Sequence, residues 1–234
     1  MDKRIIGIIG GMGPGATADL FREINALTPV KKDQDHIRVL IYSNPKIPDR
    51  TTFILGKGPD PLPAMLETAR TLQDAGAGLL MIPCNAAHYF LPRLQARIKV
   101  PILDMIRETC ARVCLDAPHL TAVGLLAATG TVRSGVYARE FERAGIEVLT
   151  PGVEAQDRVH RAIFEVKAGR HGRKTQRTLE SIGAGLVKRG AGAVILGCTE
   201  IPLAFDTAAV DYPTVNATRV LAQAAVDWAQ GKRG

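Results

Sequence analysis

The stretch AGLLMIPCNAAH, residues 77–88, and its near copy AGAVILGCTEIP, residues 191–202, decide the fold that we expect for this chain. Each begins as a short apolar strand and is followed by a strand that contains proline, VPILD from residue 100 and YPTVN from residue 212. In each copy one cysteine, Cys84 or Cys198, comes directly after the first strand. The repeat therefore predicts two related α/β units with a thiol at the same place in each.

Strand and helix patterns alternate outward from these two copies. Further apolar strands are IIGIIGG, IRVLIYS, TAVGLLA and IEVLTPG, and helical patterns begin near Gly15, Pro61, Ala86, Ser134, Thr175 and Ile201. Strands that are apolar on both faces and alternate with helices indicate parallel sheets covered by helices. We expect an α/β fold of two similar lobes related by a pseudo-twofold axis, with Cys84 and Cys198 facing each other across a cleft.

Composition and charge limit the classes of protein to which the chain could belong. The chain has 234 residues and a net charge of +7, with no apolar run of about 18 residues that could span a bilayer. The start of the chain has no signal-peptide pattern, so we expect a cytoplasmic protein with no membrane partner. The most basic stretch, VKAGRHGRKTQR at residues 166–177, lacks interleaved aromatic residues. A solvated basic face, or a small anionic substrate drawn in by it, is favoured over nucleic acid.

Two other cysteines, Cys110 and Cys114, lie four residues apart on one face of a predicted helix. Buried small hydrophobic residues explain them, because no further His or Cys stands at ligand spacing. We therefore expect no metal site.

The glycine loop in RIIGIIGGMGPGATADLFREI, residues 4–24, raises the question of a nucleotide cofactor. The spacing of Gly11, Gly13 and Ala16 fits the dinucleotide fingerprint. That fingerprint also needs an acid at the end of the second strand, where this chain has Ser43 and Asn44. The loop is better explained as a close approach of the backbone to a group other than a dinucleotide.

Cys84 and Cys198 occupy chemically favourable places. Ligands of parallel α/β sheets bind beyond the carboxyl ends of the strands, and a following helix N-terminus favours the reactive thiolate. Core cysteines are the simpler explanation for each one alone, and a redox pair would need a motif such as C-x-x-C. The matched pair instead suits two opposed thiols, one removing a proton from a bound carbon and the other returning one.

At these residues the sequence resembles the aspartate/glutamate racemase family, and more closely its amino-acid (aspartate) racemase branch. The resemblance rests on GIIGGMGPGAT, SNPKIPDRT, IPCNAAH, FEVKAG and GCTEIPL in this order. It implies a cofactor-independent racemase of two flavodoxin-like lobes, usually a homodimer. The first lobe would comprise residues 1–103 and 214–234 and the second residues 104–213, with the active site in the cleft between them.

The resemblance also assigns residues. Cys84 and Cys198 match the two catalytic cysteines, and the residues that match substrate-binding positions are Met12, Arg50, Asn85, Ala86, Lys167 and Thr199. Arg50 and Lys167 would bind the distal carboxylate of aspartate, and Met12 would lie against the substrate through its backbone. Glu200 and His88 match supporting positions, although helix capping and a structural contact near Cys84 explain them equally well.

One residue departs from the family pattern. Ala86 stands where the family usually has threonine, so a hydroxyl that commonly contacts the substrate carboxylate is absent. The leading hypothesis is a racemase that interconverts L- and D-aspartate, with glutamate as a second substrate. The alternatives are a racemase or isomerase of another amino acid or small diacid, and an inactive homologue that binds a small carboxylate. Residues 56–65, GKGPDPLPAM, are a candidate lid.

Overall fold

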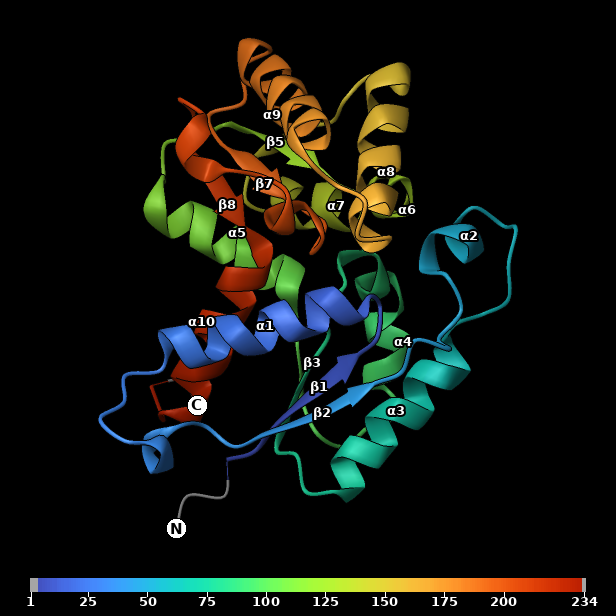
Figure 1. The fold of residues 1–234 in the computed structure, drawn as a ribbon, viewed down its shortest axis with the longest axis vertical. Coiled ribbons are helices and arrows are strands. Elements are labelled where there is room, and N and C mark those ends of the chain that lie inside the picture. The colour runs from blue at the N-terminus through green and yellow to red at the C-terminus, as the bar shows by residue number, and fades with distance from the viewer. Residues whose placement is uncertain (1–3, 233–234) are drawn as a thin grey trace.

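A computed structural model describes residues 4–232 and shows two parallel β-sheets, one in each half of the molecule (Figure 1). The first contains β1 (Ile6–Gly10), β2 (Val39–Ser43), β3 (Leu79–Met81) and β4 (Ile102–Leu103), in the order β2-β1-β3-β4. The second contains β5 (Ala122–Leu126), β6 (Glu147–Leu149), β7 (Val194–Leu196) and β8 (Thr214–Asn216), in the order β6-β5-β7-β8. Every pairing is parallel and the two orders correspond, which confirms the predicted α/β fold of two similar lobes.

Helices cover both faces of each sheet. The helices that precede β5 are α1 (Pro14–Leu27), α2 (Arg50–Ile54), α3 (Leu62–Asp74), α4 (Leu91–Gln95) and α5 (Met105–Asp116). The later helices are α6 (Thr129–Ser134), α7 (Val136–Glu142), α8 (Val153–Lys167), α9 (Arg173–Lys188) and α10 (Ala217–Ala229). The helical starts predicted near Ala86 and Ile201 are short 3₁₀ helices, Asn85–Phe90 and Ile201–Leu203.

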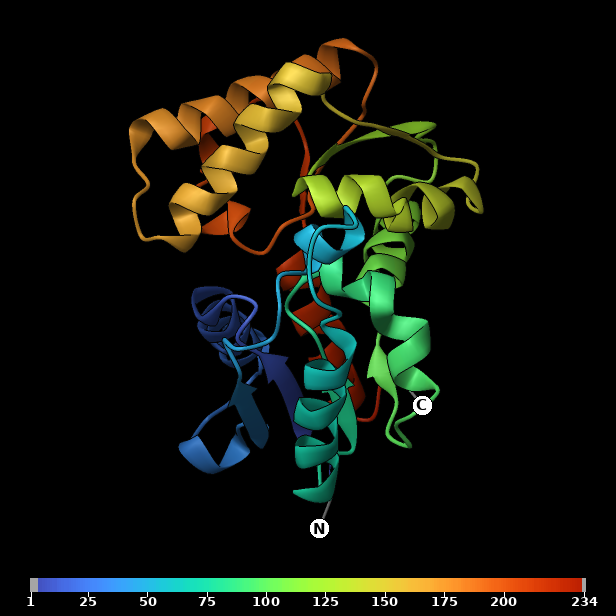
Figure 2. The same ribbon diagram turned by 90° about the vertical axis from the view of Figure 1, so that its right-hand side faces the viewer.

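Alternating residues of the strands supply two cores to each lobe. In β1, Ile6 and Ile8 pack in the cluster with α1 and α10, whereas Ile9 packs in the cluster with α3. This follows from the period of two along a strand. In the second lobe, one cluster joins the sheet to α8 and α9 and another joins it to α5 and α7. The two lobes lie one above the other, as the turned view shows (Figure 2).

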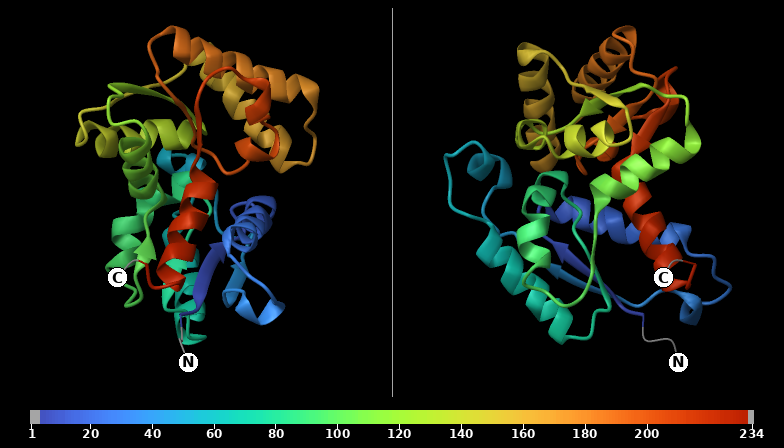
Figure 3. Two further views of the ribbon diagram at one scale, coloured as in Figure 1. Left: turned by 90° about the vertical axis from the view of Figure 1, so that its left-hand side faces the viewer. Right: turned by 180° about the vertical axis from the view of Figure 1, so that it is seen from behind.

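The chain passes between the lobes at α5 and α10, which pack against each other (Figure 3). Residues 214–216, placed with the first lobe by the predicted boundary, pair as β8 with β7 of the second sheet. The return to the first lobe comes only with α10, which packs on α1. β8 joins the second sheet because the edge of β7 has backbone N–H and C=O groups that a parallel strand can pair with.

Within residues 4–232, no helix is long and apolar enough to cross a membrane.

Candidate active site

Cys84 and Cys198 come together at the junction of the two lobes. Cys84 precedes the 3₁₀ helix Asn85–Phe90 after β3, and Cys198 follows β7. Both are buried, and both line one inner cavity. The repeat in the sequence therefore places one thiol from each lobe at a shared site.

The inner cavity has a volume of only about 20 Å³, which is room for about one water molecule. Its lining residues are Met12, Asp49, Arg50, Thr51, Cys84, Asn85, Ala86, Ala128, Thr131, Lys167, Cys198, Thr199 and Glu200. The two lobes therefore leave no room for an amino acid beside the two cysteines. An amino acid would need the walls of this cavity to move apart before it could lie between them.

Arg50 is held rigidly at the first position of α2. Asp49 caps that helix by accepting from the backbone N–H of Thr52 at 2.8 Å. The guanidinium of Arg50 donates from Nη1 to the carbonyls of Ile47 and Pro48, at 3.1 and 2.9 Å. Its Nε is buried without a partner in the described structure. A buried donor of this kind usually has a ligand or water as its acceptor.

Asn85 supplies a second such donor. Its Oδ1 accepts a 2.6 Å hydrogen bond from the hydroxyl of Tyr137, which lies on α7 of the other lobe. Its Nδ2 is buried and has no partner among the described residues. Arg50 and Asn85 therefore bring two unpaired N–H groups to a cavity that contains both thiols. Two unpaired donors suit an anionic ligand such as a carboxylate.

Glu200 connects Cys198 to the glycine loop. Its Oε2 accepts from the thiol of Cys198 at 3.0 Å, and its Oε1 accepts from the backbone N–H of Gly13 at 3.2 Å. Burial and the charge of Glu200 hold the pKa of Cys198 well above the ordinary value of a thiol, against the opposing effect of Lys167. Cys198 is therefore a protonated thiol in the resting site.

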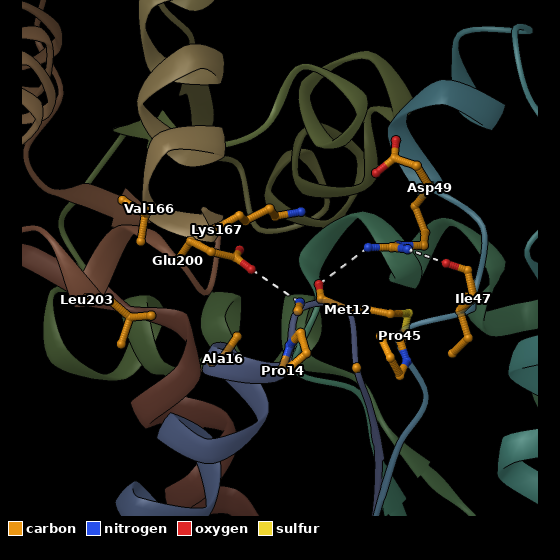
Figure 4. Close-up of a pocket in the computed structure, with 14 residues that line it drawn as sticks. Met12, Pro14, Ala16, Pro45, Ile47, Asp49, Val166, Lys167, Glu200 and Leu203 are labelled. Atoms are coloured by element: carbon orange, nitrogen blue, oxygen red, sulfur yellow. Dashed lines mark hydrogen bonds between the residues drawn. The ribbon is translucent and has the colours of Figure 1, made fainter. Parts of the chain in front are cut away.

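The glycine loop lies against the strand end after β2. Gly11 has φ of 91°, and a Cβ there would collide with the backbone of Asn44. This close approach brings the carbonyl of Met12 to the site, where it accepts from Arg50 Nη2 at 3.4 Å. The loop is thus a wall of the cavity, as the sequence predicts, and Figure 4 shows Met12 between Glu200 and Lys167 on one side and Pro45 and Ile47 on the other.

An outer cavity of about 410 Å³ adjoins the inner one. It shares Met12, Asp49, Arg50, Lys167 and Glu200 with the inner cavity, and it adds apolar walls from Ile47, Val166 and Leu203 (Figure 4). A substrate whose reacting carbon lay at the cysteines could extend its side chain here.

Lys167 ends α8 and brings a positive charge to both cavities. Its Nζ lies 5.3 Å from the ring centre of Phe164, a cation–π distance. Burial lowers the pKa of Lys167, but the negative charge of Glu200, with a further contribution from the nearby cysteine groups, outweighs it, so the pKa is raised overall. The amine is therefore a permanent cation beside the thiols.

Thr199 and His88 make hydrogen bonds to the backbone near the cysteines. The hydroxyl of Thr199 donates across the lobe junction to the carbonyl of Pro83 at 3.1 Å. His88 accepts from the backbone N–H of Met105 at Nε2, so its Nδ1 carries the proton and donates to the carbonyl of Cys84 at 2.9 Å. Complete burial lowers the pKa of His88, which keeps it neutral. His88 thus supports the loop that carries Cys84.

The structure also brings in residues that the sequence did not single out. Asp49, Thr51, Ala128 and Thr131 line the inner cavity, and Tyr137 contacts Asn85. Asp49 stands beside Arg50 in a helix-capping position, which was a usable signal. The candidate lid, residues 56–65, lines neither cavity.

No group of three or more His, Cys, Asp or Glu within the described range could hold a metal ion. Cys110 is buried and Cys114 half-buried on α5. Burial, followed by the neighbouring Cys114, raises the pKa of Cys110 to about 12. These two cysteines are separate from the two cavities.

Comparison with known proteins identifies the family. A family model described as Asp/Glu/hydantoin racemase matches residues 9–225. The broad specificity amino-acid racemase RacX of Bacillus subtilis (strain 168) is 25% identical over 230 residues, which are 95% of this chain and 96% of that protein. The chain belongs to the Asp/Glu/hydantoin racemase family, and the resemblance seen in the motifs is confirmed.

Solved structures agree with this assignment. The aspartate racemase of Picrophilus torridus superposes with a TM-score of 0.86 at 29% identity, covering 97% of this chain and 94% of that one. An aspartate racemase homologue from Pyrococcus horikoshii OT3 has a TM-score of 0.78 at 23% identity, covering 97% of this chain and 99% of the other. At 23% identity, the similarity to the Pyrococcus horikoshii protein shows a shared fold only.

Proposed function

We propose that this protein is an amino-acid racemase that needs no pyridoxal phosphate and interconverts the enantiomers of aspartate, with glutamate as a second substrate. The observation that carries the proposal is the inner cavity, where one cysteine from each lobe meets the unpaired donors of Arg50 and Asn85. The similarity to the aspartate racemase of Picrophilus torridus supports the choice of substrate.

The reaction is a two-base proton transfer. In one direction the thiolate of Cys84 removes the α-proton of the amino acid, and the thiol of Cys198 delivers its own proton to the opposite face of the same carbon. The products are the other enantiomer, a thiol at Cys84 and a thiolate at Cys198. The reverse direction exchanges the two roles. The protonated state of Cys198 beside Glu200 makes it the resting acid.

The carbanion formed between these steps needs stabilisation, because no cofactor spreads its charge. Negative charge accumulates on the α-carboxylate, where a preorganised donor lowers the barrier. The unpaired Nδ2 of Asn85 is suited to this task. Arg50 and Lys167 face the outer cavity and suit the distal carboxylate.

The test is incubation of L-aspartate with the protein in deuterium oxide without added cofactor. We expect the α-hydrogen to exchange and the optical rotation to decay to zero. Cys84→Ser and Cys198→Ser should each abolish the decay. Cys114→Ser is the matched control, because this half-buried cysteine lies on α5, outside both cavities. The proposal fails if aspartate, glutamate and neutral amino acids all remain unchanged at high enzyme concentration.

A second candidate is a racemase of other or larger amino acids. It is favoured by the apolar part of the outer cavity, formed by Ile47, Val166 and Leu203, and by the broad specificity named for RacX. Asp49 beside Arg50 also adds a negative charge that a dicarboxylate would not need. A scan of amino acids by the same exchange assay distinguishes the two, because aspartate would then be a poor substrate among several. The homodimer and the cytoplasmic location stay predictions.

A further inference from the structure

Tyr137 is fully buried in one lobe but donates its hydrogen bond to the other. It lies in the first turn of α7, and its ring packs beside Phe141 in a core cluster of the second lobe, with the ring centroids 6.1 Å apart. Its hydroxyl donates to Oδ1 of Asn85 at 2.6 Å. Asn85 directly follows Cys84 in the first lobe. The hydrogen bond therefore joins the two lobes.

This hydrogen bond decides which way the Asn85 amide faces. Burial raises the pKa of Tyr137 far above its ordinary value, so the phenol stays protonated and can donate. A donor at this place selects the amide oxygen, which leaves Nδ2 on the other side of the group. Nδ2 is buried and unpartnered in the described structure, and Asn85 lines the cavity that contains both thiols.

We propose that Tyr137 is a positioning residue, whose hydroxyl holds the Asn85 amide so that Nδ2 donates to the α-carboxylate of the substrate once the lobes have closed. The proposal rests on the proposed function. If the phenol were absent, the amide could turn over and present its oxygen to the carboxylate, where the interaction would be repulsive. Lobe closure would then no longer complete the carboxylate site.

The variant Tyr137→Phe removes this hydroxyl and keeps the buried ring. The variant would weaken the hydrogen bond from Asn85 to the charged carboxylate of the substrate, so we expect kcat/KM for aspartate to fall by about ten- to a hundredfold. Tyr212→Phe is the matched control. Tyr212 is another buried tyrosine of the second lobe, but its hydroxyl donates to the carbonyl of Glu180 at 2.9 Å, away from the cavities. This control should leave kcat/KM unchanged.

A double-mutant cycle separates positioning from general support of the fold. If Tyr137 acts through Asn85, adding Tyr137→Phe to Asn85→Ala should cause no further loss of kcat/KM. A simple weakening of the core would instead multiply the two losses. Losses that multiply overturn the proposal.

A second measurement does not depend on activity. In protein labelled with ¹⁵N at asparagine, the side-chain amide signals of Asn85 are assigned by their loss in Asn85→Ala. We expect these signals to shift or broaden in Tyr137→Phe and to remain unchanged in Tyr212→Phe. Unchanged Asn85 signals in Tyr137→Phe overturn the proposal. A wild-type protein that racemises no amino acid would refute the proposed function. Altered Asn85 signals in Tyr137→Phe would still show that the Tyr137 hydroxyl orients the Asn85 amide.

Discussion

Replacing Glu200 by glutamine tests the electrostatic control of Cys198. In the structure, Glu200 accepts from the thiol of Cys198 at 3.0 Å and from the backbone N–H of Gly13 at 3.2 Å. Glutamine keeps an oxygen for Gly13 and loses the negative charge beside the sulfur. Glu200→Gln therefore changes the charge and leaves the loop contact available.

The magnitude follows from the distance. At an effective dielectric constant of about 20, two unit charges about 4 Å apart interact by about 4 kcal/mol. Solvent in the adjoining outer cavity screens part of this interaction, but the pKa of Cys198 should still fall when the carboxylate is removed. The direction is downward because the carboxylate opposes ionisation of the thiol.

The pH profile of kcat/KM reports this shift. The proposed reaction needs one thiolate and one thiol together, so we expect activity to fall in acid, where both are protonated, and in alkali, where both are ionised. We expect the alkaline limb, governed by Cys198, to move to lower pH in Glu200→Gln. The two directions must show the same profile, because the enantiomers have equal free energy.

Alkylation of Cys198 by iodoacetamide, followed by peptide mass spectrometry, measures the same thiol directly. Its rate should rise at lower pH in the variant. Glu200→Ala is the contrast, since alanine also removes the acceptor for Gly13. An alkaline limb that stays in place or moves upward in folded Glu200→Gln would show that Glu200 does not set the protonation of Cys198.

Three further predictions concern substrate binding and closure. Arg50→Lys loses the Nε donor and the bidentate geometry of the guanidinium. KM for aspartate should therefore rise by about ten- to a hundredfold in steady-state racemisation assays. An unchanged KM would argue against a contact between Arg50 and the substrate carboxylate. Ala86→Thr restores a hydroxyl beside Cys84 and should raise kcat/KM by up to about tenfold; a fall would mean that the cavity has no room for it. Gly130→Ala places a Cβ within 3 Å of Thr51 across the α2–α6 contact. This overpacking should lower Tm by about 2–10 °C in a thermal melt. The control Gly185→Ala, whose Cβ meets no atom within 4 Å, should leave Tm unchanged.

The strands and the paired cysteines could be predicted because their signals are local. The apolar runs that end before Cys84 and Cys198 become β3 and β7, and the copied sequence places both thiols at equivalent strand ends. Arg50 was found through the resemblance of its motif to the family, and the structure adds that the preceding residue, Asp49, caps its helix. Each of these signals lies within a few neighbouring residues.

The remainder depends on contacts between distant parts of the chain. Tyr137 and Asn85 are 52 residues apart, and Thr199 and Pro83 are 116 apart. No periodicity specifies such pairs, because they form only when the lobes dock. The hydroxyl of Thr199, which lines the inner cavity, donates to a backbone carbonyl of the other lobe, a contact that the sequence did not indicate. β8 joins the second sheet for the same kind of reason, through an edge that only the folded sheet offers.

The duplicated architecture explains why the two thiols need not behave alike. The fold places Cys84 and Cys198 at equivalent strand ends, but the next residues differ, an amide in the first lobe and a threonine followed by a carboxylate in the second. Asn85 lines the cavity and has an unpaired Nδ2 donor, whereas Glu200 accepts a hydrogen bond from the thiol of Cys198. A fully symmetric pair would share its proton evenly between two equivalent thiols. The different neighbours instead favour the protonated thiol at Cys198, which is the acid of the proposed reaction when the α-hydrogen of the substrate faces Cys84.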